Sequence, residues 1–479
     1  MKTGRHIVVA AFAAVLILSS LAQATDVSGN ITTTTWTKAN SPYRVKGAIE
    51  VVLNNILTIE PGVDVLFDAD VKITAYGLIR ATGTAADSIR FLKGTAAEWG
   101  GISVTSSGTV TPPNDSSAFA YVRISGAKND GSPGYGGAIG LSQTNLKLSL
   151  DHCVLSGNTA ATEGGAVSVD NGAILYARNC LFANNTSPIG GGISFRANTT
   201  YGTISDCVFQ GNTSATDGCA IGSRTPHAAF TRCLITGNTH ANNTSTVDCF
   251  SGSNITMVNC TIANNTTTKV FDSTSGGKAA LRNCIVWGTG TVMLEAPLPG
   301  TSDPWTVTYS DIKGSWTGTG NINADPLFIN AAAGDFTLGT GSPCINTGDP
   351  ADPTDPDGSR VDMGAYPTSG STAVLAPATL ARFALYANAP NPFNPATTIR
   401  FDLPSSGFVT LAVYDINGRL VRNLLVGLAA SAARTFPAGQ HSVTWDGCDN
   451  HGRAVASGVY LVRLTAPEGV LTGRMVLLR

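Results

Sequence analysis

Apolar and polar residues alternate in short strings that return at a nearly constant interval in the middle of the chain. Each string starts at a cysteine and has an apolar residue two positions later; the first five also have an asparagine five positions later. Six cysteines, spaced 27, 27, 26, 27 and 24 residues apart, mark the interval: Cys153, Cys180, Cys207, Cys233, Cys260 and Cys284. The asparagines are Asn158, Asn185, Asn212, Asn238 and Asn265. Glycine-rich strings such as EGGAV at 163–167 follow about ten residues after the early cysteines, which completes an internal repeat.

A fixed period of this kind is typical of a solenoid, in which every repeat forms one coil. Apolar residues at alternate positions predict short strands whose inner side chains are buried when coils stack about 4.8 Å apart. Equivalent residues then form ladders along the axis, so we expect inward rows of cysteine and of large apolar residues. The apolar row would contain Leu155, Phe182, Phe209, Ile235 and Ile262. The asparagines are expected at turns, where they tolerate left-handed backbone angles and their stacked amides bond from coil to coil.

The repeat strings resemble those of right-handed parallel β-helix proteins. The pairing of GGA[IV] with Phe-x-x-Asn, at 182–185 and 209–212, is similar to the repeats of chlamydial polymorphic outer-membrane proteins. Upstream strings such as LTIEPGVDVLFDADVKITAYGLIRATGTAADSIRFLKG resemble the first coils of the same fold. Residues 324–367 resemble a segment that often closes such helices. The resemblance implies an all-β fold, with a β-helix of about eleven coils in residues 25–367.

The pattern changes after residues 368–382, which lack aromatic and acidic residues and which we interpret as a linker. Residues 383–479 contain six strings with period-two apolar patterning: TTIRFDL, VTLAVYD, RLVRNLL, HSVTWDG, GVYLVRL and RMVLL. The dipeptide Asn417-Gly418 between two of them favours a tight hairpin. Short strands with frequent turns in a segment of this length predict a β-sandwich.

This second domain resembles the FlgD-type Ig-like module and the C-terminal sorting domains of type IX secretion cargo. The motifs that carry the resemblance are NAPNPFNP at 388–395, VYDINGR at 413–419, WDG at 445–447, ASGVY at 456–460 and RMVLL at 474–478. Two features depart from it: Cys448 stands where family members usually carry a polar residue, and residues 428–436 lengthen a strand connection. The resemblance implies surface delivery or anchoring, with export and anchoring machinery as partner.

The first 24 residues have the features of a secretory signal peptide. Lys2 and Arg5 precede an apolar run at 7–21, and Ala22-Gln23-Ala24 offers a cleavage site. The run is too short for a membrane span, which needs about twenty residues. We therefore predict a mature chain that starts near Thr25, has no transmembrane helix, and is secreted or located at the outer cell surface.

Composition and charge narrow the range of partners. The 30 Lys and Arg residues nearly balance 32 Asp and Glu, for a net charge of −2, so no overall field attracts nucleic acid. Charged residues make up only 13% of the chain, while glycine takes 53 positions. Both values fit turns that recur in every coil, because stacked strands tolerate little like charge in register.

β-Helix families include pectate lyases and polygalacturonases, so catalytic carboxylates have to be considered. Glu163 and Asp217 share an offset of ten residues from the preceding cysteine, which places them two coils and roughly 10 Å apart, with Gly190 between them. That separation is at the outer edge of the range for an inverting glycosidase pair. No stacked basic residue is expected beside them. We therefore interpret both as solvated turn residues and predict no catalytic or cofactor-binding residue.

No metal site is predicted either. The six histidines form no pair at a spacing that suits a metal ion. Asp352, Asp355 and Asp357 precede Gly358 in an acidic run, but the spacing is irregular and prolines interrupt it. We favour an ordinary rigid loop here, with Ca²⁺ binding as the alternative.

The cysteines admit two interpretations. In stacked coils the Cβ atoms point in parallel rather than towards each other, which favours buried free thiols at the six repeat positions. Cys219 and Cys249 fall at the second-glycine position of successive coils. For these two, a disulfide is the alternative to free thiols.

The favoured hypothesis is an exported, non-catalytic β-helix protein that acts in adhesion or glycan binding. Its partner would be an extracellular polysaccharide or a host or neighbouring cell surface. The alternative is a polysaccharide lyase or glycoside hydrolase that works through Glu163 and Asp217. A third interpretation is a purely structural component of the cell envelope.

Overall fold

A computed structural model describes most of the chain. The described residues are 24–96, 98–105, 116–131, 134–197, 200–224, 227–242, 245–250, 252–273, 276–288, 292–294, 304–368, 384–386, 388–403, 407–425, 434–436, 439–466 and 469–478. The predicted signal peptide, except for Ala24, and nearly all of the predicted linker lie outside these residues. None of the helices in these ranges is long and apolar enough to cross a membrane.

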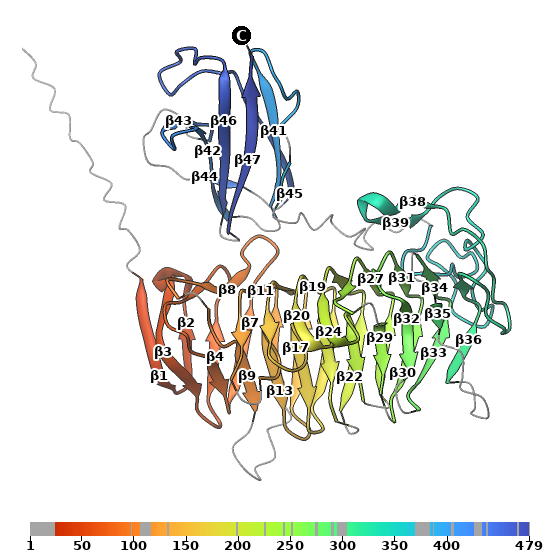
Figure 1. Cartoon of the computed structure of the whole chain (residues 1–479). Coiled ribbons are helices and arrows are strands. Elements are labelled where there is room, and N and C mark those ends of the chain that lie inside the picture. Colours follow the sequence, from red (N-terminus) through yellow and green to blue (C-terminus); the bar gives the residue numbers. More distant parts are fainter. Residues whose placement is uncertain are drawn as a thin grey trace, which may run out of the picture.

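The strands between Thr25 and Ile312 stack as a parallel β-helix (Figure 1). One row is an 11-stranded parallel sheet: β2 (Thr34–Trp36), β4 (Ile56–Ile59), β7 (Leu78–Thr82), β10 (Ser117–Ala120), β14 (Lys147–Asp151), β18 (Ile174–Arg178), β22 (Tyr201–Ser205), β26 (Ala228–Thr231), β30 (Asn254–Val258), β33 (Lys278–Arg282) and β36 (Trp305–Thr308). Parallel pairing between successive coils confirms the predicted solenoid.

Two further rows of parallel strands complete the coils. The second row contains β5 (Asp64–Phe67), β8 (Ile89–Lys93), β11 (Val122–Ser125), β15 (Val154–Ser156), β19 (Leu181–Ala183), β23 (Val208–Gln210), β27 (Leu234–Thr236), β31 (Thr261–Ala263), β34 (Ile285–Trp287) and β37 (Asp311–Ile312). The third contains β6 (Ile73–Ala75), β9 (Ile102–Thr105), β13 (Ile139–Ser142), β17 (Val167–Asp170), β21 (Ile193–Phe195), β25 (Ile221–Ser223), β29 (Ser245–Cys249), β32 (Lys269–Ser273) and β35 (Val292–Leu294). The long strands β1 (Thr25–Ile31) and β3 (Tyr43–Val51) begin the rod, and β3 pairs with both rows.

Shorter elements occupy the corners of the coils. A five-stranded parallel sheet is formed by β12 (Lys128–Asn129), β16 (Thr159–Ala160), β20 (Thr186–Ile189), β24 (Thr213–Asp217) and β28 (Thr239–His240). The 3-10 helix η1 (Lys38–Asn40) lies in the first coils. After the last coil come β38 (Phe328–Asn330), η2 (Ala331–Ala333) and β39 (Asp335–Leu338).

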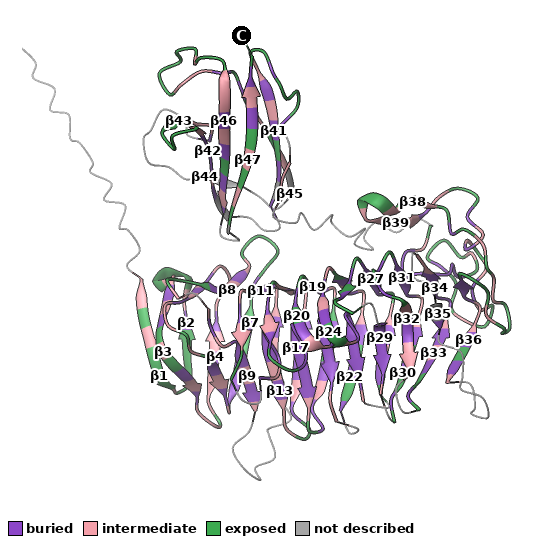
Figure 2. Ribbon diagram, in the orientation of Figure 1, coloured by how far each residue is buried: buried purple, intermediate pink, exposed green. Residues whose placement is uncertain are grey.

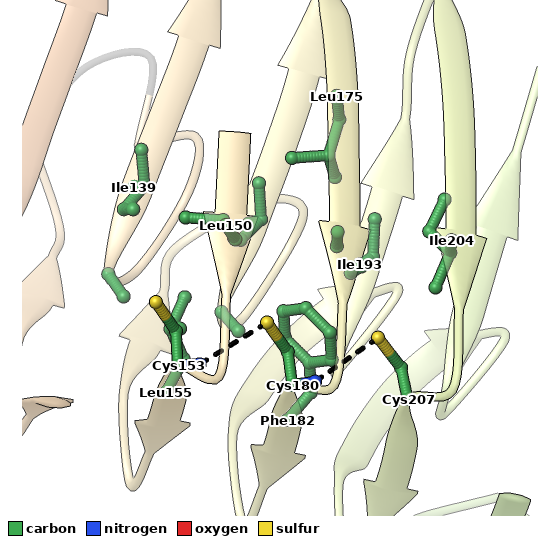
Figure 3. Packing of buried hydrophobic residues seen from close by; sticks show 14 of the residues in the cluster. Ile139, Leu150, Cys153, Leu155, Leu175, Cys180, Phe182, Ile193, Ile204 and Cys207 are labelled. Carbon is green, nitrogen blue, oxygen red and sulfur yellow. Dashed lines mark hydrogen bonds between the residues drawn. The ribbon is translucent and has the colours of Figure 1, made fainter. Parts of the chain in front are cut away.

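The interior of the rod is one continuous apolar core, and Figure 2 shows the buried residues along its strands. The inward rows follow the predicted ladders. The rings of Phe182 and Phe209, on successive coils, stack with centroids 4.9 Å apart. Figure 3 shows the thiols of Cys153, Cys180 and Cys207 in one row, and the backbone N–H of each of the first two donates to the next sulfur at 3.4 Å.

All ten cysteines are free, and the six of the repeat are buried, as predicted for a thiol ladder. Burial raises the pKa of the Cys153 and Cys180 thiols well above the usual range. Cys219 and Cys249 do not occupy equivalent positions. Cys219 N–H donates to Ser245, whereas Cys249 pairs with Ser223, so the two lie about 13 Å apart along β29, beyond the reach of a disulfide.

The repeat asparagines form a second buried ladder that runs from coil to coil. The side-chain N–H of Asn158 and of Asn185 donates to the next asparagine Oδ1 at 3.0 Å, and the pattern continues through Asn212 and Asn238 to Asn265. The predicted amide bonding is therefore confirmed. The predicted left-handed backbone belongs instead to the residue just before each asparagine: Gly157, Asn184, Gly211, Gly237 and Asn264. The inward side chain needs a turn immediately before it, and the residue at that turn takes the positive φ.

Several charged residues form an ion pair with a residue of opposite sign on the neighbouring coil. Asp151 stands beside Arg178 in register, with Oδ2 and Nη2 2.7 Å apart. Asp206 and Arg232 each precede a repeat cysteine, and Oδ1 and Nε are 2.6 Å apart. At these positions the next coil supplies the counter-charge, although residues of like charge stand in register elsewhere in the rod.

The segment after the last coil folds back against the outside of the rod. Phe336 and Tyr366 pack on Leu234 and Ala263 of β27 and β31. A buried carboxylate, Asp311, joins the segment to the last coil, because it accepts hydrogen bonds from Ala324 N–H at 3.1 Å and from the Cys344 thiol at 3.3 Å. Burial raises the pKa of Asp311 to about 6.

The C-terminal domain is the predicted β-sandwich. A three-stranded antiparallel sheet contains β40 (Ala384–Leu385), β41 (Thr397–Leu403) and β45 (Gly439–Trp445). The facing sheet contains β42 (Gly407–Asp415), β43 (Leu420–Asn423), β46 (Gly458–Ala466) and β47 (Gly469–Leu477), and β44 (Arg434–Phe436) pairs with β42. Side chains from both sheets, Trp445 and Val462 among them, share one core. Cys448 is half-buried, and its carbonyl accepts the Trp445 indole N–H at 3.0 Å.

Replacing one asparagine of the ladder should destabilise the rod strongly. Asn212→Ala removes donors to Phe182 O and Asn238 Oδ1, and it leaves the buried amide of Asn185 without its acceptor. We expect the free energy of unfolding to fall by roughly 3 kcal/mol, since each unsatisfied buried group costs about 1–3 kcal/mol. Urea denaturation measures the change. The exposed Asn242→Ala is the control, and an equal effect of both variants would contradict the ladder's contribution.

The buried carboxylate of Asp311 predicts a pH dependence. Its pKa is raised in the folded chain, so the charged form is disfavoured there and stability is lost as pH rises from about 4 to about 6. Relative to Asp311→Asn, the wild type should lose about 2 kcal/mol of unfolding free energy between pH 4 and pH 7. Urea midpoints of both proteins at the two pH values test this. A difference that does not change with pH would show that the carboxylate is not desolvated.

Candidate functional site

Glu163 lies at the centre of a charged cluster on the third row of strands. It precedes β17 and is only 7% exposed, so its predicted position as a solvated turn residue is wrong. Its Oε1 accepts a hydrogen bond from Arg224 Nη1 at 2.8 Å, and its Oε2 accepts one from Ser194 Oγ at 2.8 Å. The Nε of Arg196 lies 3.3 Å from the same Oε2. Glu163 therefore meets two guanidinium groups at once.

The register of the coils brings these groups together. Asp170 ends β17, and Arg196 and Arg224 directly follow β21 and β25, where each takes the equivalent place one coil further along. Arg196 also forms an ion pair with Asp170 through Nη1. Glu163 reaches along the axis across these coils. Two carboxylates and two guanidinium groups thus form one network without net charge.

Aromatic rings cover both arginines. The guanidinium carbon of Arg196 lies 3.4 Å from the ring centroid of Tyr135, and that of Arg224 lies 4.5 Å from the ring centroid of Phe250. Contacts of this kind hold a cation in place where it is partly removed from water. The arginines are therefore fixed by stacking as well as by their ion pairs.

Asp217 does not join this network as a partner of Glu163. Glu163 pairs with Ile189, and Ile189 pairs with Asp217, so the two acids do share one ladder, two coils apart. The residue between them is Ile189, not the predicted Gly190, because one residue fewer separates Cys180 from its glycine than in the coils on either side. Asp217 is half-buried at the end of β24. Among the described residues, Asp217 therefore lies on the same side of the ladder as Glu163, two coils away from it.

The sequence pattern did not reveal Arg196 and Arg224 as neighbours of Glu163 when positions in the repeat were numbered from the preceding cysteine. Counted from the left-handed glycines instead, Asp170, Arg196 and Arg224 each stand six residues after Gly164, Gly190 and Gly218. The expectation that no stacked basic residue accompanies Glu163 is therefore wrong. The equal offset from the glycines was the signal in the sequence that would have revealed them.

The chemistry of this cluster is that of a closed ion network. Both oxygens of Glu163 already accept donors of the protein, and little of the side chain reaches solvent. A general acid or base needs an oxygen that faces the substrate, within hydrogen-bond reach of the proton it moves. The arrangement therefore favours a structural connection between coils over proton transfer.

The acidic run near residue 355 is also occupied by protein groups. Asp352 Oδ2 accepts from the Asn283 side chain at 2.7 Å and pairs with Arg282 Nε at 2.9 Å. Asp355 accepts from the backbone N–H of Asp362, and Asp357 from that of Ser359. In the part of the chain that the structure describes, no three acidic, histidine or cysteine side chains converge as metal ligands. The carboxylates bind the terminal segment to itself and to β33 and its following turn.

Comparison with known proteins agrees with this architecture. Residues 100–296 match the family described as right handed beta helix region, and residues 391–469 match the FlgD Ig-like domain. The crystal structure of pectate lyase Pel9A has 15% sequence identity and a TM-score of 0.36, with 72% of this chain and 86% of that chain covered. A structure of PorZ, an essential surface component of the type-IX secretion system of Porphyromonas gingivalis, has 22% identity and a TM-score of 0.15. That match covers 26% of this chain and 14% of the PorZ chain. No curated protein matches the chain.

Removing the charge of Glu163 should reduce stability. Glu163→Gln leaves Arg196 and Arg224 partly desolvated without their shared counter-charge, which typically costs about 3 kcal/mol or more. Chemical denaturation of the full chain measures the loss. Asp217→Asn, on the same ladder, is the matched control and should change stability by less than about 0.5 kcal/mol. Equal stability of the Glu163→Gln protein and wild type would contradict the structural interpretation of the network.

Proposed function

We propose that this protein, a right-handed parallel β-helix followed by a FlgD Ig-like domain, is an exported, non-catalytic protein that binds glycans. It would act at the bacterial surface or after release from it, in adhesion or in attachment to extracellular polysaccharide. The proposal depends mainly on the burial and the ion pairs of Glu163. The carboxylate with the best claim to catalysis is buried between two arginines, and Asp217 stands two coils away from it.

The N-terminus and the C-terminal domain support export. The charged start, apolar run and small-residue cleavage site of residues 1–24 are those of a signal peptide. The C-terminal domain would deliver or anchor the rod at the surface, as its likeness to sorting domains suggests. In this proposal the β-helix supplies the binding surface and the second domain supplies the location.

A glycan panel separates this function from its alternatives. The full mature chain is incubated with neutral and acidic polysaccharides, with and without Ca²⁺, while both binding and the release of reducing or unsaturated ends are measured. We expect binding to at least one polysaccharide and no product. Product formation that disappears in Asp217→Asn, a variant expected to fold normally, would establish a lyase or hydrolase. A protein that binds none of the panel would act as a structural envelope component.

A further inference from the structure

The outer face of the 11-stranded sheet carries two exposed aromatic side chains on neighbouring coils. Tyr176 of β18 is 44% exposed and Tyr201 of β22 is 45% exposed. Among the described residues of the stacked coils, these two are the large apolar side chains that reach furthest into solvent. Exposed rings cost free energy in water unless a partner covers them. Because β18 and β22 are adjacent strands, the two tyrosines form a single surface feature.

A third ring extends this feature to the next coil. His227 is exposed and stacks on Tyr201, with ring centroids 4.7 Å apart and planes 10° from parallel. Because this separation equals the spacing between coils, the two rings stand on edge and their outer edges face solvent. The polar atoms of such rings can exchange hydrogen bonds with a ligand while the ring carbons contact its apolar parts.

Small residues lie in register beside the rings. Tyr176 pairs with Thr203, and the ladder continues through Ala229 and Thr256 to Ala280. Side chains of this size leave room above the sheet along the rod axis, and the threonines offer hydroxyl groups on alternate coils. Tyr176 stands at one end of this row of small residues, with only Ser149 beside it on the preceding coil.

The middle of this face is almost uncharged, although Lys147 of β14 and Lys278 of β33 flank it. The outward side chains of β18, β22, β26 and β30 include one charged residue, Arg178, which is already paired with Asp151. The other outward residues are Ile174, Tyr176, Tyr201, Thr203, Ser205, Ala229, Thr231, Asn254, Thr256 and Val258. The outward side chains of these four strands offer no unpaired counter-charge to a polyanion, and they suit a ligand with many hydroxyl groups and apolar C–H faces.

We infer that Tyr176, Tyr201 and the neighbouring His227 bind a chain of uncharged sugars that lies along the row from Thr203 to Thr256. The inference rests on the proposed glycan binding and names its surface and ligand class. The coils repeat at about the length of one sugar unit, so equivalent hydroxyl groups of protein and ligand can meet more than once along the axis. Sugar rings would contact Tyr176 and the edges of the Tyr201–His227 pair.

Affinity electrophoresis of the full mature chain tests the site. The gels contain a neutral polysaccharide, such as hydroxyethylcellulose, xyloglucan or soluble starch, or an acidic one, polygalacturonate or alginate. We expect wild type to be retarded by at least one neutral polysaccharide and by neither acidic one, with little effect of salt, because no ion pair is formed. Tyr176→Ala and Tyr201→Ala should each weaken binding about tenfold, and the double variant should abolish it.

Two controls keep the outcome interpretable. Both tyrosines are exposed, so thermal unfolding of their variants should match wild type. Ile329→Ala removes a similarly exposed apolar side chain from the terminal segment and should bind like wild type. Unchanged binding in the double variant, or binding to acidic polysaccharides alone, would overturn this site while glycan binding itself stands. Absence of binding to every polysaccharide would overturn both proposals.

Discussion

The register between successive coils is the constraint on which the rest of the structure depends. Parallel hydrogen bonding places each residue beside its equivalent one coil further along, about 4.8 Å away. Each side chain therefore has to pack beside the equivalent side chain of the next coil, which in the repeat is often the same residue type. Asparagine does so because its amide is both donor and acceptor, so a buried row satisfies itself. Cysteine and phenylalanine do so as apolar rows in the core.

Charged residues are subject to the same constraint, but for them an equivalent neighbour of the same sign is unfavourable. Like charges in one ladder repel, and several charged residues of the rod face the opposite sign on the next coil, as Asp151 and Arg178 do. In the cluster around Glu163, two arginines at equivalent positions share one carboxylate instead. Its acids and bases cancel across several coils, which connects those coils and engages both oxygens of Glu163 with protein donors.

On the outer face of the 11-stranded sheet, side chains do not have to fill a core, so the same register aligns exposed residues in rows. Two tyrosines on adjacent coils and a stacked histidine stand beside a row of small residues, in the middle of the face where the one charged residue, Arg178, is paired. A rod of stacked coils presents such rows in straight lines. This makes a linear, repeating ligand a natural match, and it connects the architecture with the proposed binding of neutral glycans.

The sequence by itself determined the period, the inward rows, the free thiols at the six repeat positions and the separate sandwich domain. These follow from short-range patterns: apolar alternation, the interval between cysteines and the turn residues of the second domain. Only the tertiary structure decided which outward residues meet, because alignment across coils is set by backbone pairing and not by counting from one landmark. One residue fewer after Cys180 puts Ile189 in line with Glu163, and the pairing of β17, β21 and β25 places Arg196 and Arg224 at equivalent positions near Glu163. The burial of Glu163 and the grouping of Tyr176 with Tyr201 depend on that alignment, since side chains 25 or more residues apart become neighbours only when the coils stack.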